Sequence, residues 1–393
     1  MIDSILPSYS RANLRFVKGE GVWLFTENGE KYLDMGAGIA VNCLGHANPH
    51  LTKILTDQAS QLWHTSNLYH IPNQEKLANN LVQSTFADTV FFTNSGTESM
   101  ECAIKMARKF HHSNDDPERT EIITFENSFH GRSLAMISAA GSEKLTKGFE
   151  PILSGFIQIQ YNNIEKLTEV VSTKTAAIVL EPIQGEGGII PAQEHFLSQV
   201  KKLCVENGIL LILDEIQCGV GRTGSLFAYE EYEVKPDIMA IAKGIGGGFP
   251  LGACLATERA AQGMTAGTHG STYGGNPLAC AVGNAVLEII NDQEFLDKVK
   301  DKSLLLKQKL AYLLDQHPDI FEEIRGKGLM MGLKCKILNT DLVNAGYQKG
   351  LITVPGGDNT IRLLPPLNIT NKEIDLAVTM LDECAKHLKL KEG

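Results

Sequence analysis

The sequence lacks any long hydrophobic segment. No stretch of its 393 residues approaches the roughly 18 consecutive apolar residues of a membrane-spanning helix, so we expect none. Residues 1–16 contain an aspartate, a proline and two arginines and lack the apolar centre of a secretory signal. The formal net charge of −10 argues against nucleic acid or anionic membrane as a partner. An anionic ligand would have to be bound by local arginines or backbone N–H groups.

The sequence also lacks paired cysteines. None of its eight cysteines belongs to a C-x-x-C pair, and several lie inside apolar segments. This pattern argues against a zinc site or a disulfide framework and indicates buried free thiols in a reducing compartment. We therefore predict a cytoplasmic protein without a bound metal.

Short apolar segments alternate with helix-like segments through the middle of the chain. The apolar segments show no alternation with polar residues, which fits strands covered on both faces. They predict an α/β fold with a mostly parallel sheet, and a helix over residues 97–110. The predicted strands are residues 89–93, 121–125, 156–160, 176–180, 209–213 and 238–242.

The two ends of the chain differ from the middle. Residues 17–45 predict short strands and turns, with a hairpin candidate at Asn28-Gly29. We predict a large domain over residues 46–275 and a smaller α+β domain built from residues 1–45 and 276–393. The elements predicted in the C-terminal part are helices to about residue 317, short strands at 332–334, 351–354 and 360–363, and an amphipathic helix at 371–388.

Two charged residues follow two of the predicted strands. Asp214 follows the apolar segment 209–213, and Lys243 stands between the segment 238–242 and a glycine-rich stretch. In open α/β sheets, ligands bind at the carboxyl ends of the strands. Pyridoxal phosphate requires an amine that forms a Schiff base and a carboxylate that partners its pyridinium nitrogen. Either residue alone would be interpreted as an ordinary loop charge.

Two further segments supply groups that fit the same ligand. Residues 95–97 (Ser-Gly-Thr) join a strand to a helix, where free N–H groups bind phosphate, although an ordinary helix cap has the same composition. Phe129 and His130 offer rings that could stack on a pyridine, and Arg132 could hold a carboxylate. The alternative is a core phenylalanine with a surface histidine and arginine.

Three more polar residues lie in informative positions. Glu186 belongs to a segment of acids and glycines after the strand at 176–180, and Gln217 lies three residues beyond Asp214. Gln217 could donate to the phenolic oxygen of the cofactor. Arg362 lies in an apolar segment, where it is either functional or purely structural.

Two other motifs would indicate a nucleotide-binding protein. Residues 209–215 resemble a Walker-B strand, but the sequence contains no G-x-x-x-x-G-K-[ST] loop to bind a triphosphate. Residues 219–224 match G-x-G-x-x-G, but they lie beyond the end of the strand and precede a poor helix opener. A nucleotide fold therefore remains a weak alternative.

The motifs together resemble the class III pyridoxal-phosphate-dependent aminotransferases. The signature block comprises Asp214-Glu215-Ile216-Gln217, Gly221-Arg222-Thr223-Gly224, Pro236-Asp237 and residues 242–250. The segments that resemble the acetylornithine aminotransferase branch of this family are residues 38–42, 44–46, 94–98, 129–132 and 271–277. The resemblance extends over nearly the whole chain.

This resemblance implies a fold type I transferase that is an obligate homodimer with two active sites at the subunit interface. It implies pyridoxal 5'-phosphate as the cofactor, with Lys243 as the Schiff-base lysine. Asp214 would pair with the pyridinium nitrogen, Gln217 would reach the phenolic oxygen, and Phe129 would pack on the ring. The implied phosphate-binding residues are Gly96, Thr97 and, approaching from the partner subunit, Thr272 with Ser271 beside it.

The resemblance also implies that four residues bind the substrates: Arg132, Ser271, Glu186 and Arg362. Arg132 would bind the carboxylate farthest from the reacting carbon, and Arg362 would bind the α-carboxylate of glutamate. Glu186 would pair with Arg362 when the substrate has no near carboxylate, because an unpaired buried charge is costly.

The implied reaction transfers the terminal amine of N2-acetylornithine to 2-oxoglutarate, giving N-acetylglutamate 5-semialdehyde and glutamate, in arginine biosynthesis. Ornithine, succinylornithine and 4-aminobutyrate are alternative donors. A second hypothesis is an aminomutase on the same scaffold, which would need no 2-oxoglutarate and would have little use for Arg362. The presence of both Glu186 and Arg362 argues against it.

Overall fold

The computed structural model describes residues 4–392. Residues 1–3 and 393 lie outside the described residues. In the predicted small domain, residues 1–3 begin the N-terminal part and residue 393 ends the C-terminal part. Residues 1–3 also begin the segment 1–16, for which we predict no secretory signal, so that prediction falls partly outside the described residues.

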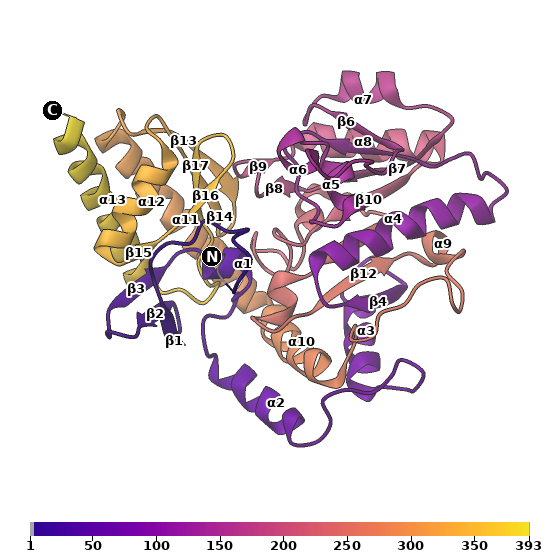
Figure 1. The fold of residues 1–393 in the computed structure, drawn as a ribbon, viewed down its shortest axis with the longest axis horizontal. Coiled ribbons are helices and arrows are strands. Elements are labelled where there is room, and N and C mark those ends of the chain that lie inside the picture. The colour runs from indigo at the N-terminus through magenta and orange to yellow at the C-terminus, as the bar shows by residue number, and fades with distance from the viewer. Residues whose placement is uncertain (1–3, 393) are drawn as a thin grey trace.

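A seven-stranded sheet forms the centre of the larger part of the molecule (Figure 1). Its neighbouring pairs β11–β10, β10–β7, β7–β5 and β5–β6 are parallel. In spatial order the strands are β4 (Thr89–Thr93), β12 (Gly252–Ala256), β11 (Ile238–Ile241), β10 (Leu210–Asp214), β7 (Thr175–Leu180), β5 (Glu121–Phe125) and β6 (Phe156–Ile159).

The predicted α/β class is confirmed, and all six predicted strands are present with ends shifted by at most one residue. The sequence pattern missed β12, which runs antiparallel between β4 and β11. Its residues, Gly-Ala-Cys-Leu-Ala, are mostly small and follow a glycine-rich stretch, so local composition favours a loop. Hydrogen bonding to a neighbour on each side makes this segment a strand.

Helices cover both faces of this sheet, and neighbouring residues of β10 point to opposite faces. Leu213 packs in a cluster with Phe196 of α8, whereas Ile212 packs in a different cluster with Met100 of α4. Burial on both faces explains why these strands are continuously apolar. The helices of this part are α2 (Pro49–Ala59), α3 (Pro72–Gln83), α4 (Gly96–Ser113), α5 (Leu134–Ala140), α6 (Glu143–Thr146), α7 (Ile164–Val170), α8 (Glu194–Asn207), α9 (Glu258–Ala261), α10 (Pro277–Ile290) and the 3-10 turns η1 (Ala228–Tyr232) and η2 (Lys243–Gly246).

Two four-stranded sheets form the smaller part of the molecule, where segments from both ends of the chain lie together (Figure 1). The first sheet contains β1 (Phe16–Glu20), β2 (Trp23–Thr26), β3 (Lys31–Asp34) and β15 (Leu351–Ile352). The second contains β13 (Phe321–Lys327), β14 (Met330–Cys335), β17 (Thr360–Leu363) and β16 (Val354–Gly356). The helices beside them are α1 (Ala37–Ala40), α11 (Gln293–Gln316), α12 (Asn339–Lys349) and α13 (Asn371–Glu392).

The pairing of β3 with β15 joins residues more than 300 positions apart, since Leu33 lies opposite Leu351. The predicted hairpin is present between β2 and β3, and Gly29 has a φ of 82° in its turn. The sequence pattern did not predict β13. The domain boundaries at residues 45/46 and 275/276 stay a prediction. The helix α10, which follows the second boundary, packs against α2, α3 and η2.

The eight cysteines are all buried free thiols, as their apolar surroundings predicted. Over residues 4–392, no helix is both long enough and apolar enough to cross a membrane. In the same part of the chain, no three His, Cys, Asp or Glu side chains form a group that could hold a metal ion.

We expect the replacement Leu213→Ala to lower the free energy of unfolding by ~2–5 kcal/mol, because Leu213 is fully buried in β10 and its loss leaves a cavity. The matched control is Leu304→Ala in α11, where the leucine is exposed and the expected change is within ~0.5 kcal/mol. Urea unfolding of both variants at one protein concentration measures the difference. Equal losses would contradict this account of the core.

Candidate active site

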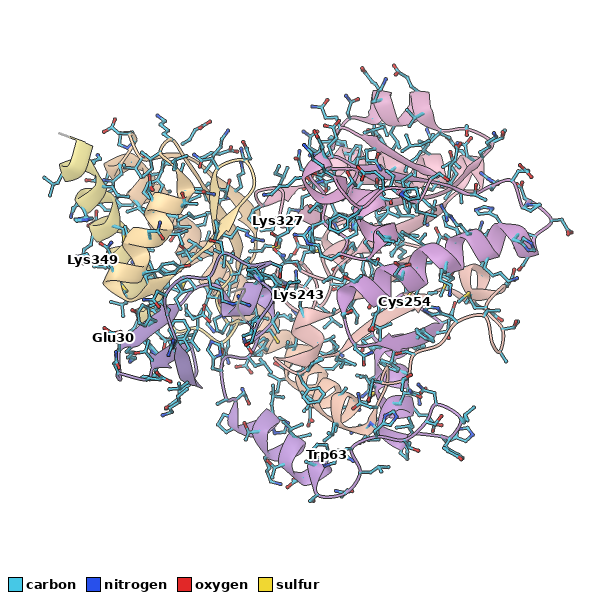
Figure 2. All side chains as sticks on the ribbon, viewed as in Figure 1. Glu30, Trp63, Lys243, Cys254, Lys327 and Lys349 are labelled. Carbon is cyan, nitrogen blue, oxygen red and sulfur yellow. The ribbon has the colours of Figure 1, made fainter. Side chains whose placement is uncertain are left out.

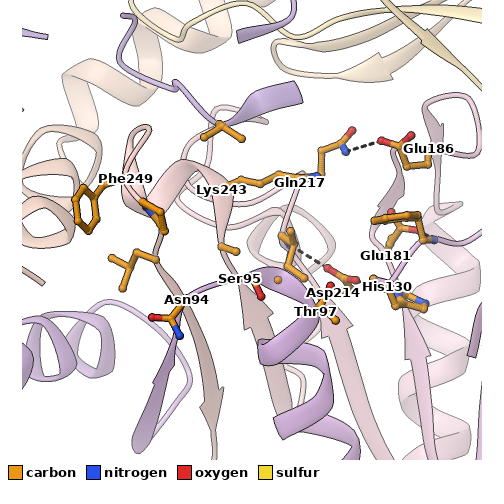
Figure 3. Close-up of a pocket in the computed structure, with 18 of the residues that line it drawn as sticks. Asn94, Ser95, Thr97, His130, Glu181, Glu186, Asp214, Gln217, Lys243 and Phe249 are labelled. Carbon is orange, nitrogen blue, oxygen red and sulfur yellow. Dashed lines mark hydrogen bonds and ion pairs between the residues drawn. The ribbon is translucent and has the colours of Figure 1, made fainter. Parts of the chain in front are cut away.

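Three polar residues lie together at the carboxyl ends of three neighbouring strands of the large sheet. Asp214 ends β10, Lys243 follows β11, and Glu181 follows β7. All three line a cavity of about 330 Å³ (Figure 3). The sequence predicted this meeting of Asp214 with Lys243, because parallel strands present their carboxyl ends at one edge of the sheet.

Lys243 lies in the wall of this cavity with a strained backbone. Its φ is +48°, in the left-handed region that side chains other than glycine rarely adopt. Burial lowers the pKa of its amine, although the carboxylates of Glu186 and Asp214 act in the opposite direction. Burial therefore shifts this amine toward its neutral form, the form that accepts a proton or attacks a carbonyl carbon.

Asp214 is held by a buried histidine. His130 Nδ1 lies 2.7 Å from Asp214 Oδ2, and the backbone N–H of Ile216 donates to Asp214 Oδ1 over 3.1 Å. Burial by itself would lower the pKa of His130, but the hydrogen bond and charge of Asp214 outweigh burial and raise it. The Asp214 side chain is therefore held in a fixed position at the floor of the cavity.

The first turn of α4 forms another part of the wall. Ser95 caps the helix by accepting the N–H of Glu98, and Gly96 and Thr97 line the cavity beside it. A Cβ atom on Gly131, whose φ is +138°, would collide with the Thr97 side chain. The backbone after β5 therefore approaches this helix terminus closely, where the helix dipole and free N–H groups favour an anion.

An ion pair joins the large sheet to the smaller part of the molecule at the rim of the cavity. Both carboxylate oxygens of Glu186 accept from the guanidinium of Arg362, whose Nη2 also donates to the Pro355 carbonyl over 3.0 Å. The charge and hydrogen bonds of Arg362 lower the pKa of Glu186, despite the opposing effect of burial. Gln217 Nε2 lies 3.5 Å from Glu186 Oε1 (Figure 3).

These residues fit pyridoxal phosphate. The helix terminus at Gly96 would hold the phosphate, Asp214 the ring nitrogen, and the Lys243 amine the aldehyde. Within residues 4–392, Gln217 Oε1 and His130 Nε2 are buried polar atoms without a hydrogen-bond partner in the protein. Polar atoms of this kind suit a bound polar group.

The sequence matches the aminotransferase class-III family over residues 7–385. The chain belongs to the class-III aminotransferases. It is 58% identical over 389 residues to a protein named acetylornithine aminotransferase from Rhodobacter capsulatus, covering 99% of both chains.

Solved structures of class-III aminotransferases have the same fold. The ornithine aminotransferase from Toxoplasma gondii gives a TM-score of 0.95 at 30% identity, covering 99% of this chain and 94% of that chain. The N-acetylornithine aminotransferase from Stenotrophomonas maltophilia gives a TM-score of 0.86 at 36% identity, covering 97% of this chain and 98% of that chain. The fold type I transferase that the motifs implied, with pyridoxal 5'-phosphate as its cofactor, is therefore confirmed.

Some residues implied by the aminotransferase motifs lie outside the cavity lining of the single chain. Arg132 is exposed, and its guanidinium lies 4.8 Å above the ring centroid of Phe129, which does line the cavity. Thr272 is exposed, while the Ser271 hydroxyl accepts from Asn94 at the cavity edge over 3.3 Å.

Two buried cavity residues were named in motifs but not assigned as site residues. His130 was considered for stacking, and the structure instead places it in a hydrogen bond with Asp214, 84 positions away. Glu181 begins the segment of acids and glycines that follows the predicted strand at 176–180. Burial raises its pKa to about 7. No local signal could reveal these partners, because the contacts depend on which strands are neighbours.

The two nucleotide-binding motifs have structural roles in this aminotransferase. Glu215 is buried and accepts the backbone N–H groups of Ala228 and Tyr229 over 2.6 and 2.7 Å. In the glycine-rich loop, the buried Arg222 donates to the Leu329 carbonyl over 3.2 Å, which fastens the loop to the smaller part of the molecule. The nucleotide-binding hypothesis is wrong.

We expect His130→Gln to destabilise the protein by ~1–3 kcal/mol below about pH 6.5, the ordinary histidine pKa, and by progressively less as the pH rises. The sign follows because a raised pKa in the folded state contributes stability that is lost on deprotonation. The control is His111→Gln. Burial lowers the pKa of His111, which bonds the Ala176 carbonyl, so its contribution is lost as the pH falls. Urea unfolding from pH 5.5 to 8.5 measures the loss of stability in both variants. If the two losses changed with pH in the same direction, the raised pKa of His130 would be contradicted.

Proposed function

We propose that this aminotransferase moves the terminal amine of N2-acetylornithine to 2-oxoglutarate, giving N-acetylglutamate 5-semialdehyde and glutamate, in arginine biosynthesis. The observation that carries the proposal is the Glu186–Arg362 ion pair at the rim of the cavity that Lys243 lines. The similarity along the whole chain to proteins named acetylornithine aminotransferase supports this donor.

The ion pair suits an enzyme that accepts two kinds of substrate. Glutamate carries a carboxylate next to its reacting carbon, and Arg362 would bind it once Glu186 moves away. The reacting carbon of N2-acetylornithine has no such carboxylate, so Glu186 would stay on Arg362 and neutralise it. Without Glu186, the buried guanidinium would be left unpaired at a high cost.

Arg132 would bind the distant carboxylate of both substrates. The carboxylate of N2-acetylornithine lies one bond farther from the reacting carbon than the distant carboxylate of glutamate. One exposed, long side chain above Phe129 can serve both distances. A guanidinium binds a carboxylate through two parallel hydrogen bonds, which also fixes the orientation of the substrate.

The cofactor-binding roles follow from the walls of the cavity. Asp214 would hold the pyridinium nitrogen, Gln217 the phenolic oxygen, and Phe129 one face of the ring. The phosphate would lie against Gly96 and Thr97 at the start of α4. Pyridoxal phosphate, when bound, withdraws electrons from the carbon that bears the amine.

Lys243 would act as the catalytic acid and base. Its neutral amine would remove the proton from the substrate carbon that bears the nitrogen. It would then return a proton to the carbon atom bonded to the other side of that nitrogen. Burial lowers the pKa of this amine, which favours the neutral form that a base requires. The two substrates would react in turn, in a ping-pong sequence.

We further propose that two copies of the chain form a homodimer and complete each other's sites through Thr272, with Ser271 beside it. The supporting observation is an exposed apolar patch in contact with this loop. Asn67 donates to the Ser271 carbonyl over 3.0 Å, and the rings of His64 and Tyr273 lie 5.1 Å apart. The exposed apolar residues of the patch are Leu62, Trp63 (Figure 2), Leu68, Tyr69 and Tyr273.

The eight buried free thiols support a reducing compartment, and we propose the cytoplasm.

We expect Leu68→Asp to weaken the dimer at least ~10-fold, because a charge would be buried in the apolar interface. Leu68 is 86% exposed in the single chain, and Leu390 in α13, 82% exposed, offers the same change as a control. Sedimentation measured over a range of protein concentrations gives the dissociation constants. Equal behaviour of the two variants would contradict the proposed interface.

The proposed reaction is tested by recording the near-visible absorbance of the holoenzyme before and after N2-acetylornithine is added without an acceptor. We expect the band to shift to shorter wavelength, and 2-oxoglutarate to restore it. The Lys243→Ala variant should lose at least ~10²-fold in the rate of this change, because it lacks the acid and base. Ornithine, succinylornithine and 4-aminobutyrate tested alongside rank the donors.

A holoenzyme whose band no amino donor discharges would overturn the transamination and favour the aminomutase. A better response to ornithine would overturn only the proposed donor. A Lys243→Ala variant with the wild-type rate would overturn the role of the lysine.

A further inference from the structure

Glu181 is a buried carboxylate in the active-site wall that the proposed mechanism does not use. Its side chain lies among the residues of the cavity (Figure 3). It is 5% exposed and lies directly after β7, the strand between β5 and β10. Its Oε2 accepts the backbone N–H of Phe129, and its Oε1 accepts the backbone N–H of Gly185, both over 3.2 Å. One side chain therefore joins the segment that carries the ring-packing Phe129 to the segment that carries Glu186.

The two segments that Glu181 joins also touch each other directly. Gln184 Nε2 donates to the Glu126 carbonyl over 3.0 Å. A Cβ atom on Gly187 would lie only 2.9 Å from the Asn127 carbonyl oxygen. The segment after β5 and the segment around Glu186 are thus packed at backbone distance, which leaves little freedom for either to shift alone.

The backbone of Glu186 is fixed from both sides. On one side, the preceding residue Gly185 donates to Glu181 in the large sheet. On the other side, the Glu186 carbonyl accepts the N–H of Gly357 over 2.8 Å, in the smaller part of the molecule. With the Gly185 N–H and the Glu186 carbonyl both held, rotation of its side chain lets Glu186 leave Arg362 and return to the same place.

We propose that Glu181 is a positioning residue that sets the choice between the two substrates, because it holds the Glu186 backbone where its carboxylate can neutralise Arg362. This inference rests on the proposed function. Both carboxylate oxygens of Glu181 already accept backbone N–H groups, so we assign it a positioning role and not a catalytic one. Its effect passes through Glu186, so it concerns only the substrate that needs Glu186 on Arg362.

The chemistry of the side chain explains why a carboxylate stands at this position. Two backbone N–H groups need two acceptors, and a carboxylate offers one oxygen to each. A glutamine of the same size would offer one oxygen and present an NH₂ group to the second N–H. One segment would then lose its bond and shift, although the cavity volume would hardly change.

The test is Glu181→Gln in the holoenzyme, with each amino donor followed in a single turnover by the near-visible absorbance. We expect kcat/KM for N2-acetylornithine to fall at least ~10-fold, because Arg362 is left poorly paired. The kcat/KM for glutamate should fall less than ~3-fold, because the carboxylate of glutamate itself pairs with Arg362. The ratio of the two values is therefore the decisive measurement. An equal fall for both donors, or an unchanged ratio, would overturn the proposal.

A double variant tests whether Glu181 acts through Glu186. On a Glu186→Gln background, Glu181→Gln should leave the substrate ratio unchanged, because the carboxylate it positions is already gone. Additive changes in the ratio would overturn the proposal. If Glu181→Gln fails to fold, Glu181→Asp replaces it, since the shorter carboxylate reaches only one N–H and should shift the ratio in the same direction.

The matched control is Tyr161→Phe. The Tyr161 hydroxyl donates to the backbone carbonyl of Glu181 over 2.6 Å, so this change disturbs the same residue without touching its carboxylate. Stability should fall while the substrate ratio stays within ~2-fold of the wild type. A ratio shift as large as that of Glu181→Gln would show that any local disturbance has this effect and would overturn the proposal.

The wild-type enzyme separates failure of this inference from failure of the proposed function. If wild type prefers ornithine or 4-aminobutyrate, the proposed donor is wrong, and the ratio of that terminal amine to glutamate still tests Glu181. If no donor discharges the wild-type cofactor, both the function and this inference are refuted.

Discussion

The parallel pairing of β7, β10 and β11 is the constraint on which the rest of the site depends. These strands are buried on both faces and end at one edge of the sheet, where Glu181, Asp214 and Lys243 follow them. Since the backbone hydrogen bonds fix the register, with Asp214 opposite Ala240, the distances between these side chains are set before any ligand arrives. A shift in register would separate the amine from the carboxylate.

Buried charges at this edge are stabilised by partners that lie far apart in the chain. Asp214 has His130, and Arg362 has Glu186. Glu181 accepts two backbone N–H groups, and the nearby His130 also opposes the rise that burial causes in its pKa. An unpaired charge in such surroundings would cost several kcal/mol. Each pair therefore couples the electrostatics of the cavity to the relative position of two chain segments.

The smaller part of the molecule contributes directly to this chemistry. Arg362 belongs to β17, and its ion pair crosses to a segment of the large sheet. Gly357 holds the backbone of the same segment, and Arg222 fastens a neighbouring loop to the Leu329 carbonyl. In the proposed reaction, substrate choice would therefore depend on contacts between the two parts of the molecule, and changes far from Lys243 in sequence would alter it.

The sequence by itself determined the fold class, six strands of the large sheet, and the meeting of Asp214 with Lys243, because continuous apolar segments and the residues that end them are local properties. Only the tertiary structure decided that β12 is a strand, since its small residues carry no strand signal until neighbours bond to them. The partners of His130 and Glu181 were also decided there. Hydrogen bonds over 84 and 52 positions depend on strand order, which local composition does not encode.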